Sequence, residues 1–204
     1  RRTIYNDPIR PGRNGLIGLS ERIEVNSPLE LVILMLGTND FQANHEHTAE
    51  DAAKGMKALI EEIRYTTLEP EMLIPKILVI SPPPILEPKG DIAMKFKDGD
   101  KKCVGLAEAY EQLCKEEKCN FFDARKITTS SKVDGVHFDL DQHLTFGNAI
   151  SEYIKTREYI VTVYNFSDLD SVYDELETAG KTPPNVKLER AVYCLQRKPT
   201  SRNT

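Results

Sequence analysis

The sequence lacks the features that would assign it to a membrane or a nucleic acid. Its longest unbroken apolar run, Leu31 to Leu36, is far shorter than the roughly 20 residues that a transmembrane helix needs. Basic residues are in the minority, with 27 Lys and Arg against 32 Asp and Glu. The net charge of -5 gives no electrostatic reason to expect nucleic acid or an anionic membrane as a partner. We therefore expect a small or neutral partner.

Cysteine is also scarce, with only Cys103, Cys114, Cys119 and Cys194 in the chain. Four cysteines in 204 residues are too few for a disulfide scaffold, and their spacing matches no zinc-binding pattern. We interpret them as buried or idle thiols of a protein in a reducing compartment, which favours the cytoplasm. The sequence indicates no metal and no other cofactor.

The chain has no methionine at its start and no internal repeat. It opens on Arg1-Arg2-Thr3 in loop-like sequence, and residues 196–204 form a polar, basic end without a closing helix or strand. We therefore expect that the natural start and the natural end both lie outside this sequence. Hydrophobic residues at 40% and charged residues at 29% otherwise fit one globular domain of ordinary size.

Short apolar segments predict three buried strands. Residues 31–36 are apolar on both alternating faces and stop at Gly37, which is typical of a parallel sheet covered on both sides. Residues 76–80 predict a second such strand, which ends at the three prolines 82–84 because proline donates no ladder hydrogen bond. Residues 119–123 predict a short third strand.

Apolar residues at helical spacing predict a helix after each of these strands. The first helix begins after Thr48, which forms a capping-box pattern with Asp51. A second covers residues 103–114, and the last runs from about residue 142 to residue 156. The residues of this last helix that we expect to face inward are Leu144, Ile150, Tyr153 and Ile154.

Strands that alternate with helices predict an α/β fold, in which a parallel sheet lies between two layers of helices as an α/β/α sandwich. The pattern changes beyond residue 157, where a strand at 159–163, a helix at 169–176 and a strand at 191–195 are expected. We therefore divide the chain into a domain of residues 1–157 and an unassigned strand-helix-strand tail of residues 158–204.

Two polar segments lie where ligands bind in such a fold, at the carboxyl ends of the strands. Gly37-Thr38-Asn39-Asp40 follows the first strand, where Asn39 can present an amide donor to a developing oxyanion. Asp134-Gly135-Val136-His137 precedes the last helix. A carboxylate three residues before an imidazole can fix its tautomer and stabilise the imidazolium that forms when His137 takes a proton. Taken singly, each segment is also compatible with an ordinary turn or solvated loop.

In combination, these segments resemble the SGNH (GDSL-like) hydrolase family, and in particular its bacterial arylesterase and acyltransferase branch. The resemblance implies a flavodoxin-like SGNH fold and an ester hydrolase without a cofactor. It also implies that His137 is the general base, Asp134 its orienting partner and Asn39 an oxyanion-hole donor, with Gly37 and Asp40 shaping the turn. The segments that carry the resemblance are Arg2-Thr3, Asp7-Pro8, residues 13–16, residues 31–40, residues 81–84, residues 121–124, residues 134–139 and His143.

One departure from the family pattern is important. The family's nucleophilic serine sits in a Gly-Asp-Ser segment at the end of the first strand, and this sequence contains no Gly-Asp-Ser. We therefore expect a chain that is truncated at its N-terminus and that cannot run the acyl-enzyme cycle by itself. The strand at 31–36 would then have an unpaired apolar edge, unless the 159–163 strand covers it.

Alternatives to an esterase remain open at this point. A catalytically inactive binding module, or a gene fragment, would retain the crevice without a serine. A metal-dependent hydrolase is a third hypothesis, although the spacing fits no standard zinc set. The resemblance also allows a homo-oligomer, because the arylesterase branch often assembles. The residues that prompt the metal hypothesis are His45, Glu46, His47, Asp134, His137, Asp139, Asp141 and His143.

Overall fold

The computed structural model describes residues 1–156 and the backbone of residues 192–196. Four strands form one sheet in the order β3-β2-β1-β4. The strands β1 (Leu29–Leu34), β2 (Lys76–Ser81) and β3 (Asn120–Asp123) are parallel. The three predicted parallel strands are therefore confirmed, with β1 beginning two residues earlier than the sequence pattern indicated.

The outer edge of β1 is paired, so the prediction that it stays unpaired is wrong. The fourth strand, β4 (Val192–Gln196), runs antiparallel to β1, with Val32 opposite Cys194 in the register. The sequence predicts this strand at 191–195 but cannot show that it pairs with β1, which lies more than a hundred residues earlier in the chain. The predicted strand at 159–163 and helix at 169–176 lie outside the described residues.

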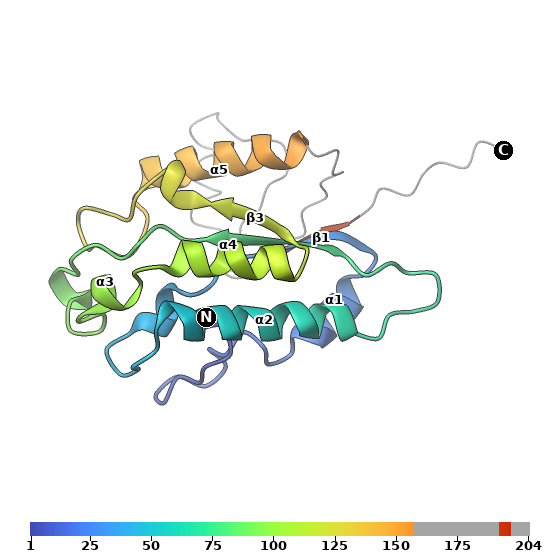
Figure 1. The fold of residues 1–204 in the computed structure, drawn as a ribbon, viewed down its shortest axis with the longest axis horizontal. Coiled ribbons are helices and arrows are strands. Elements are labelled where there is room, and N and C mark those ends of the chain that lie inside the picture. Colours follow the sequence, from blue (N-terminus) through green and yellow to red (C-terminus); the bar gives the residue numbers. More distant parts are fainter. Residues whose placement is uncertain (157–191, 197–204) are drawn as a thin grey trace, which may run out of the picture.

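Five α-helices accompany the sheet in the described part of the chain. Their bounds are α1 (Leu19–Asn26), α2 (Ala49–Tyr65), α3 (Gly99–Lys102), α4 (Leu106–Glu116) and α5 (Leu140–Lys155). In Figure 1, α5 lies on one side of the sheet, while α2 and α4 lie on the other. The predicted α/β/α sandwich is therefore confirmed for this part of the chain.

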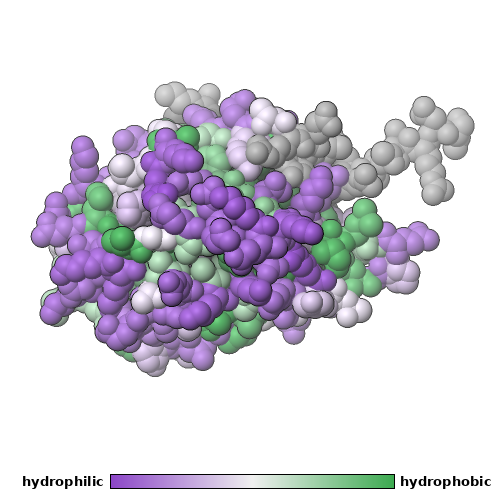
Figure 2. Space-filling view, viewed as in Figure 1, coloured by the Kyte–Doolittle hydropathy of each residue, from purple (hydrophilic) through white to green (hydrophobic). Residues whose placement is uncertain are grey.

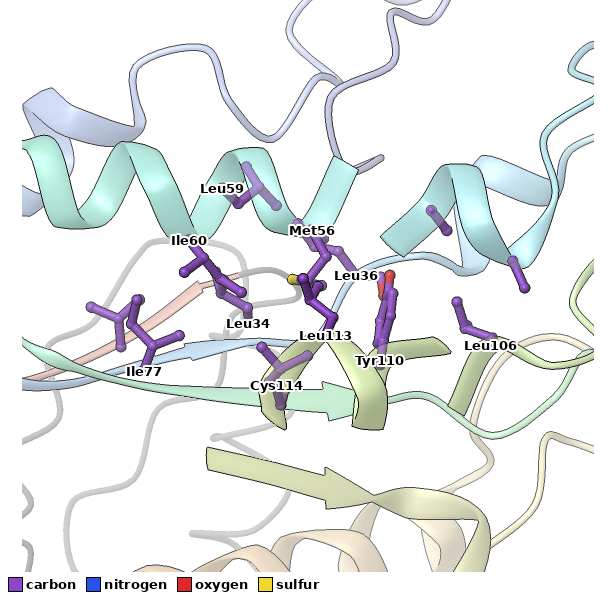
Figure 3. Close-up of a cluster of buried hydrophobic side chains, with 14 of the residues drawn as sticks. Leu34, Leu36, Met56, Leu59, Ile60, Ile77, Leu106, Tyr110, Leu113 and Cys114 are labelled. Atoms are coloured by element: carbon purple, nitrogen blue, oxygen red, sulfur yellow. The ribbon is translucent and has the colours of Figure 1, made fainter. Parts of the chain in front are cut away.

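Side chains of successive strand residues enter two separate cores, as the pleat of a strand requires. Val32 and Leu34 face α1, α2 and α4, whereas Leu31 and Ile33 face α5. Figure 3 shows the first core, in which Met56 and Ile60 of α2 meet side chains of α4 above the sheet. Fully burying one such side chain is worth about 1.5–3 kcal/mol.

The helix ends follow their local sequence. The capping box of α2 is confirmed, because the Thr48 side chain accepts from the Asp51 amide and the Asp51 side chain accepts in return. A second capping box, formed by Asp139 and Gln142, starts α5 at Leu140. The helix therefore begins two residues earlier than the predicted start at about residue 142. The expectation that Leu144 faces inward is wrong.

Phe146 takes the place expected of Leu144. Leu144 is 51% exposed, and Phe146 is buried in the core under α5. Figure 2 shows a surface on which hydrophilic residues predominate and apolar residues occur in small groups. No helix of the described residues is long and apolar enough to span a bilayer.

Candidate active site

The candidate site is assembled from segments that follow the parallel strands. A 3-10 turn, η1 (Thr38–Phe41), follows β1 by four residues. Another, η3 (Ala124–Lys126), follows β3 directly and leads toward the loop that carries Asp134 and His137. Since β1 and β3 are both parallel to β2, these segments all leave the same edge of the sheet.

Asp134 and His137 are in direct contact. The Oδ2 atom of Asp134 lies 2.6 Å from Nδ1 of the His137 ring. Its other oxygen, Oδ1, accepts the backbone N–H groups of Val136 at 2.8 Å and of His137 at 2.9 Å. One carboxylate oxygen therefore fixes the turn, and the other is free to hold the ring with a proton on Nδ1. This arrangement leaves Nε2 as the nitrogen that can accept a proton.

The environment keeps Asp134 ionised and His137 accessible. Burial by itself would raise the pKa of Asp134, but the Val136 amide, the His137 ring and the His137 amide outweigh it and lower that pKa. The His137 side chain is 48% exposed. A carboxylate that stays charged beside a reachable imidazole is the arrangement that general-base catalysis requires.

The loop around this pair is fastened to the segment that follows β2. The amide of Leu86 donates to the Gly135 carbonyl at 2.8 Å, and the amide of Lys89 donates to the Asp134 carbonyl at 3.0 Å. Gly135 has φ 81 and a Cβ there would collide with the Glu87 carbonyl. The backbone conformation at position 135 therefore requires glycine.

Ser130 and Ser131, which the sequence analysis did not identify, also fasten this loop through hydrogen bonds. The Ser131 hydroxyl donates to the Asp139 carboxylate at 2.8 Å, and the Ser131 amide donates to the His137 carbonyl at 2.7 Å. The Ser130 hydroxyl donates to the Pro84 carbonyl at 2.8 Å. The sequence feature that could have located this end of the loop is the capping pattern of Asp139 and Gln142 at the start of α5.

Asn39 lies in the η1 turn, and Gly37 immediately precedes it. Gly37 has φ 122, and a Cβ there would lie 2.7 Å from the hydroxyl of Tyr110. The Asn39 amide donates to the Arg1 carbonyl at 3.3 Å, while its oxygen accepts from the Gln42 side chain at 2.7 Å. The bond to Arg1 is long for an N–H···O contact, so the donor that we expected to serve an oxyanion is only weakly engaged. Asn39 does not hydrogen bond to Asp134 or His137.

Asp40 does more than shape the turn, because it is fully buried and binds the N-terminal segment. Its carboxylate accepts the Thr3 amide at 2.9 Å and the Thr3 hydroxyl at 2.6 Å. Burial raises the pKa of Asp40 to about 6, against the lowering influence of the Thr3 hydrogen bonds and of Arg2. The structure thereby corrects our view of this residue as a simple turn former.

This raised pKa predicts a specific dependence of stability on pH. Between about pH 4, where a free Asp titrates, and about pH 6, folded Asp40 holds a proton that the unfolded chain has released. The stabilisation that protonated Asp40 adds to the unfolding free energy is therefore fully present below about pH 4, and it is lost as the pH rises through this window. The loss should be about 2–3 kcal/mol by about pH 8.

Asp40→Asn supplies the matched control for this prediction. The Asn oxygen can still accept the Thr3 amide, and its NH₂ can donate to the Thr3 hydroxyl. Urea unfolding of both proteins should show wild type losing stability relative to the variant as the pH rises from about 4 to about 8. Parallel curves for the two proteins across this range would contradict the assignment to Asp40.

The residues that prompted the metal hypothesis do not converge. The His45 and His47 rings are stacked, with 4.9 Å between their ring centroids. The Tyr5 ring stacks on His47 with a centroid distance of 3.6 Å. Asp139 is engaged by Ser131 at the start of α5. In residues 1–156 and 192–196, no three His, Cys, Asp or Glu side chains lie together so that they could hold a metal ion.

The comparisons with known proteins agree with one another. Residues 3–145 match the model of the GDSL-like lipase/acylhydrolase family. The chain is similar to a solved aryl esterase of M. smegmatis, with 34% identity and a TM-score of 0.73. The match covers 76% of this chain and 74% of that one. A carbohydrate acetylesterase from Sinorhizobium meliloti has 29% identity and a TM-score of 0.73, and the match covers 77% of this chain and 74% of that one.

A further solved structure from Sinorhizobium meliloti belongs to the same group. It is a carbohydrate acetylesterase family member with 31% identity and a TM-score of 0.71, and the match covers 76% of this chain and 75% of that one. A search of curated proteins gave no match. The family-model match and these structures show that the chain belongs to the GDSL-like lipase/acylhydrolase family, the family of SGNH esterases.

Proposed function

We propose that this protein takes part in ester hydrolysis by acyl transfer, with His137 as the general base and Asp134 as the residue that orients it. The contact of 2.6 Å between Asp134 and a half-exposed His137 ring carries this proposal. Small-molecule esters are the proposed substrates, because the similar solved proteins are an aryl esterase and carbohydrate acetylesterases. No cofactor enters the scheme.

In this proposal, a serine hydroxyl attacks the ester carbonyl and passes its proton to Nε2 of His137. Asp134 stabilises the imidazolium that results. The Asn39 amide donates to the oxyanion, in place of its long bond to the Arg1 carbonyl. Gly37 and Asp40 fix the η1 turn that presents Asn39.

This sequence does not contain the nucleophile in the family's form. Ser81, Ser130 and Ser131 are all buried, and each donates its hydroxyl proton to another group. We therefore propose that the serine is encoded in the same reading frame beyond this sequence. We also propose residues 1–157 as the hydrolase domain, although β4 from the remaining range pairs with β1.

The test is to express the whole reading frame and to assay it with p-nitrophenyl acetate. We expect turnover with a burst of p-nitrophenol, and loss of both on His137→Ala. His143→Ala is the matched control, since His143 is an exposed histidine one turn along α5 and should leave the rate unchanged. Turnover that survives His137→Ala would refute the assignment of the general base.

A second function is favoured by the absence of a Gly-Asp-Ser segment. If the reading frame adds no serine segment, the crevice would serve a catalytically inactive binding module. The same experiment separates the two functions. Saturable binding of an ester without any release of p-nitrophenol would support the binding module and refute the hydrolase.

A further inference from the structure

The turn between α4 and β3 brings two cysteines together. The backbone leaves the helix with Lys118 in the left-handed region, at φ 50. The amide of Cys119 then donates to the carbonyl of Cys114 at 3.0 Å. This hydrogen bond across six residues is the Schellman helix end, in which the side chains at its first and last positions face each other.

The residues at these two positions are both cysteines, and neither is in a disulfide. Each thiol is the neighbour that shifts the pKa of the other most strongly. Cys114 is only 2% exposed and belongs to the core cluster drawn in Figure 3. Cys119 is partly exposed at the surface end of the pair. The geometry therefore pairs one accessible thiol with one protected thiol.

The charges around the turn favour a thiolate at Cys119. The neighbouring Cys114 thiol lowers the pKa of Cys119, burial and Glu117 oppose this, and Arg64 adds to the lowering. The Cys119 thiol, together with burial, raises the pKa of Cys114. Arg64 is held beside the turn because its guanidinium donates to the Glu117 carboxylate at 2.6 Å.

We propose that Cys114 and Cys119 form a redox-active dithiol, which a low-molecular-weight disulfide such as oxidised glutathione converts into an internal disulfide. The Cys119 thiolate attacks one sulfur of the small disulfide, so that a mixed disulfide forms and one small thiol leaves. Cys114 then loses its proton and attacks the Cys119 sulfur, which releases the second small thiol. The protein loses two electrons and two protons, and the small disulfide is reduced to two thiols.

Cys103 provides a contrast within the same chain. It is buried, burial raises its pKa, and its sulfur lies near the backbone carbonyls of Ile85 and Asp100. It has neither an accessible position nor a thiol partner among the described residues. Cys103→Ser is therefore the matched control for variants of the pair.

The experiment is to incubate the folded chain with oxidised glutathione, alkylate the remaining thiols, digest with trypsin and analyse the peptides by mass spectrometry. Lys115 and Lys118 lie between the two cysteines, so trypsin cleaves the chain inside the loop that the disulfide closes. We expect the peptide of residues 103–115 to be joined to that of residues 119–125. The Cys103→Ser variant should give the same joined pair.

The variants of the pair distinguish its two members. Cys114→Ser should stop at a glutathione adduct on Cys119, and Cys119→Ser should remain unmodified in the folded protein. A wild type that stops at the Cys119 adduct, that reacts equally at Cys103, or that does not react at all would overturn the proposal. A thermal unfolding scan of each variant confirms that the folded state is being tested. None of these outcomes depends on ester hydrolysis.

Discussion

Replacing Asp134 with asparagine is expected to reduce ester hydrolysis by the whole encoded protein about 10³- to 10⁴-fold. The substitution keeps the turn, because the Asn oxygen can still accept the backbone N–H groups of Val136 and His137. It replaces the oxygen that lies 2.6 Å from Nδ1 of His137 with an NH₂ donor. The ring must then accept at Nδ1 and carry its proton on Nε2, which is the wrong tautomer for a general base.

The measurement is kcat/KM for p-nitrophenyl acetate as a function of pH, together with the unfolding free energy of each variant. Asp141→Asn is the matched control, because Asp141 is exposed in the first turn of α5 and should leave both quantities unchanged. A loss of activity in Asp134→Asn that follows a loss of stability would contradict the tautomer argument. An unchanged rate would remove Asp134 from the proposed site.

Local sequence was sufficient to predict the elements that position this site. Strands buried on both faces carry unbroken apolar runs, and a helix with one buried stripe repeats its apolar residues every three to four positions. The capping pattern of Thr48 and Asp51 was readable for the same reason, since both of its partners lie within four residues. The contact between Asp134 and His137 is also local, spanning three residues.

Features that depend on distant parts of the chain were not predictable in this way. The pairing of β4 with β1 joins residues that a local pattern cannot relate. Asp40 was read as part of a turn, although its carboxylate binds Thr3, which lies 37 positions earlier in the chain. The inward position of Phe146 in place of Leu144 reflects the rotation of α5 against the sheet, which its own sequence leaves open.

The N-terminal segment is the part of the structure that joins these distant features to the candidate site. Thr3 is tied to Asp40 of the η1 turn, and Asn39 of the same turn binds the carbonyl of Arg1. Gln42 completes the connection, since its amide donates to Asn39 and its oxygen accepts from Arg2. The orientation of the proposed oxyanion donor therefore depends on how firmly Arg2 is held.

Replacing Asp7 with asparagine is expected to destabilise the protein by about 3–5 kcal/mol, because it leaves a buried guanidinium without its counter-charge. The Arg2 side chain is 2% exposed, and its Nη1 lies 2.7 Å from the Asp7 carboxylate. That hydrogen bond holds the pKa of Asp7 well below its usual range. The variant keeps the turn at Asp7, since its oxygen can still accept the amides of Ile9 and Arg10.

Urea unfolding of three further proteins separates the buried charge from other effects. Glu152→Ala breaks the exposed pair of Glu152 with Lys155 and should cost less than about 1 kcal/mol. Arg2→Met alone leaves an Asp7 carboxylate that is 11% exposed and still accepts the Ile9 and Arg10 amides, so this variant should cost less than Asp7→Asn. Combining Arg2→Met with Asp7→Asn should recover much of the lost stability, because the double variant no longer buries an unpaired charge. Additive losses in the double variant would mean that Arg2 stabilises the N-terminal segment through its packing and its bond to Gln42, and not through Asp7.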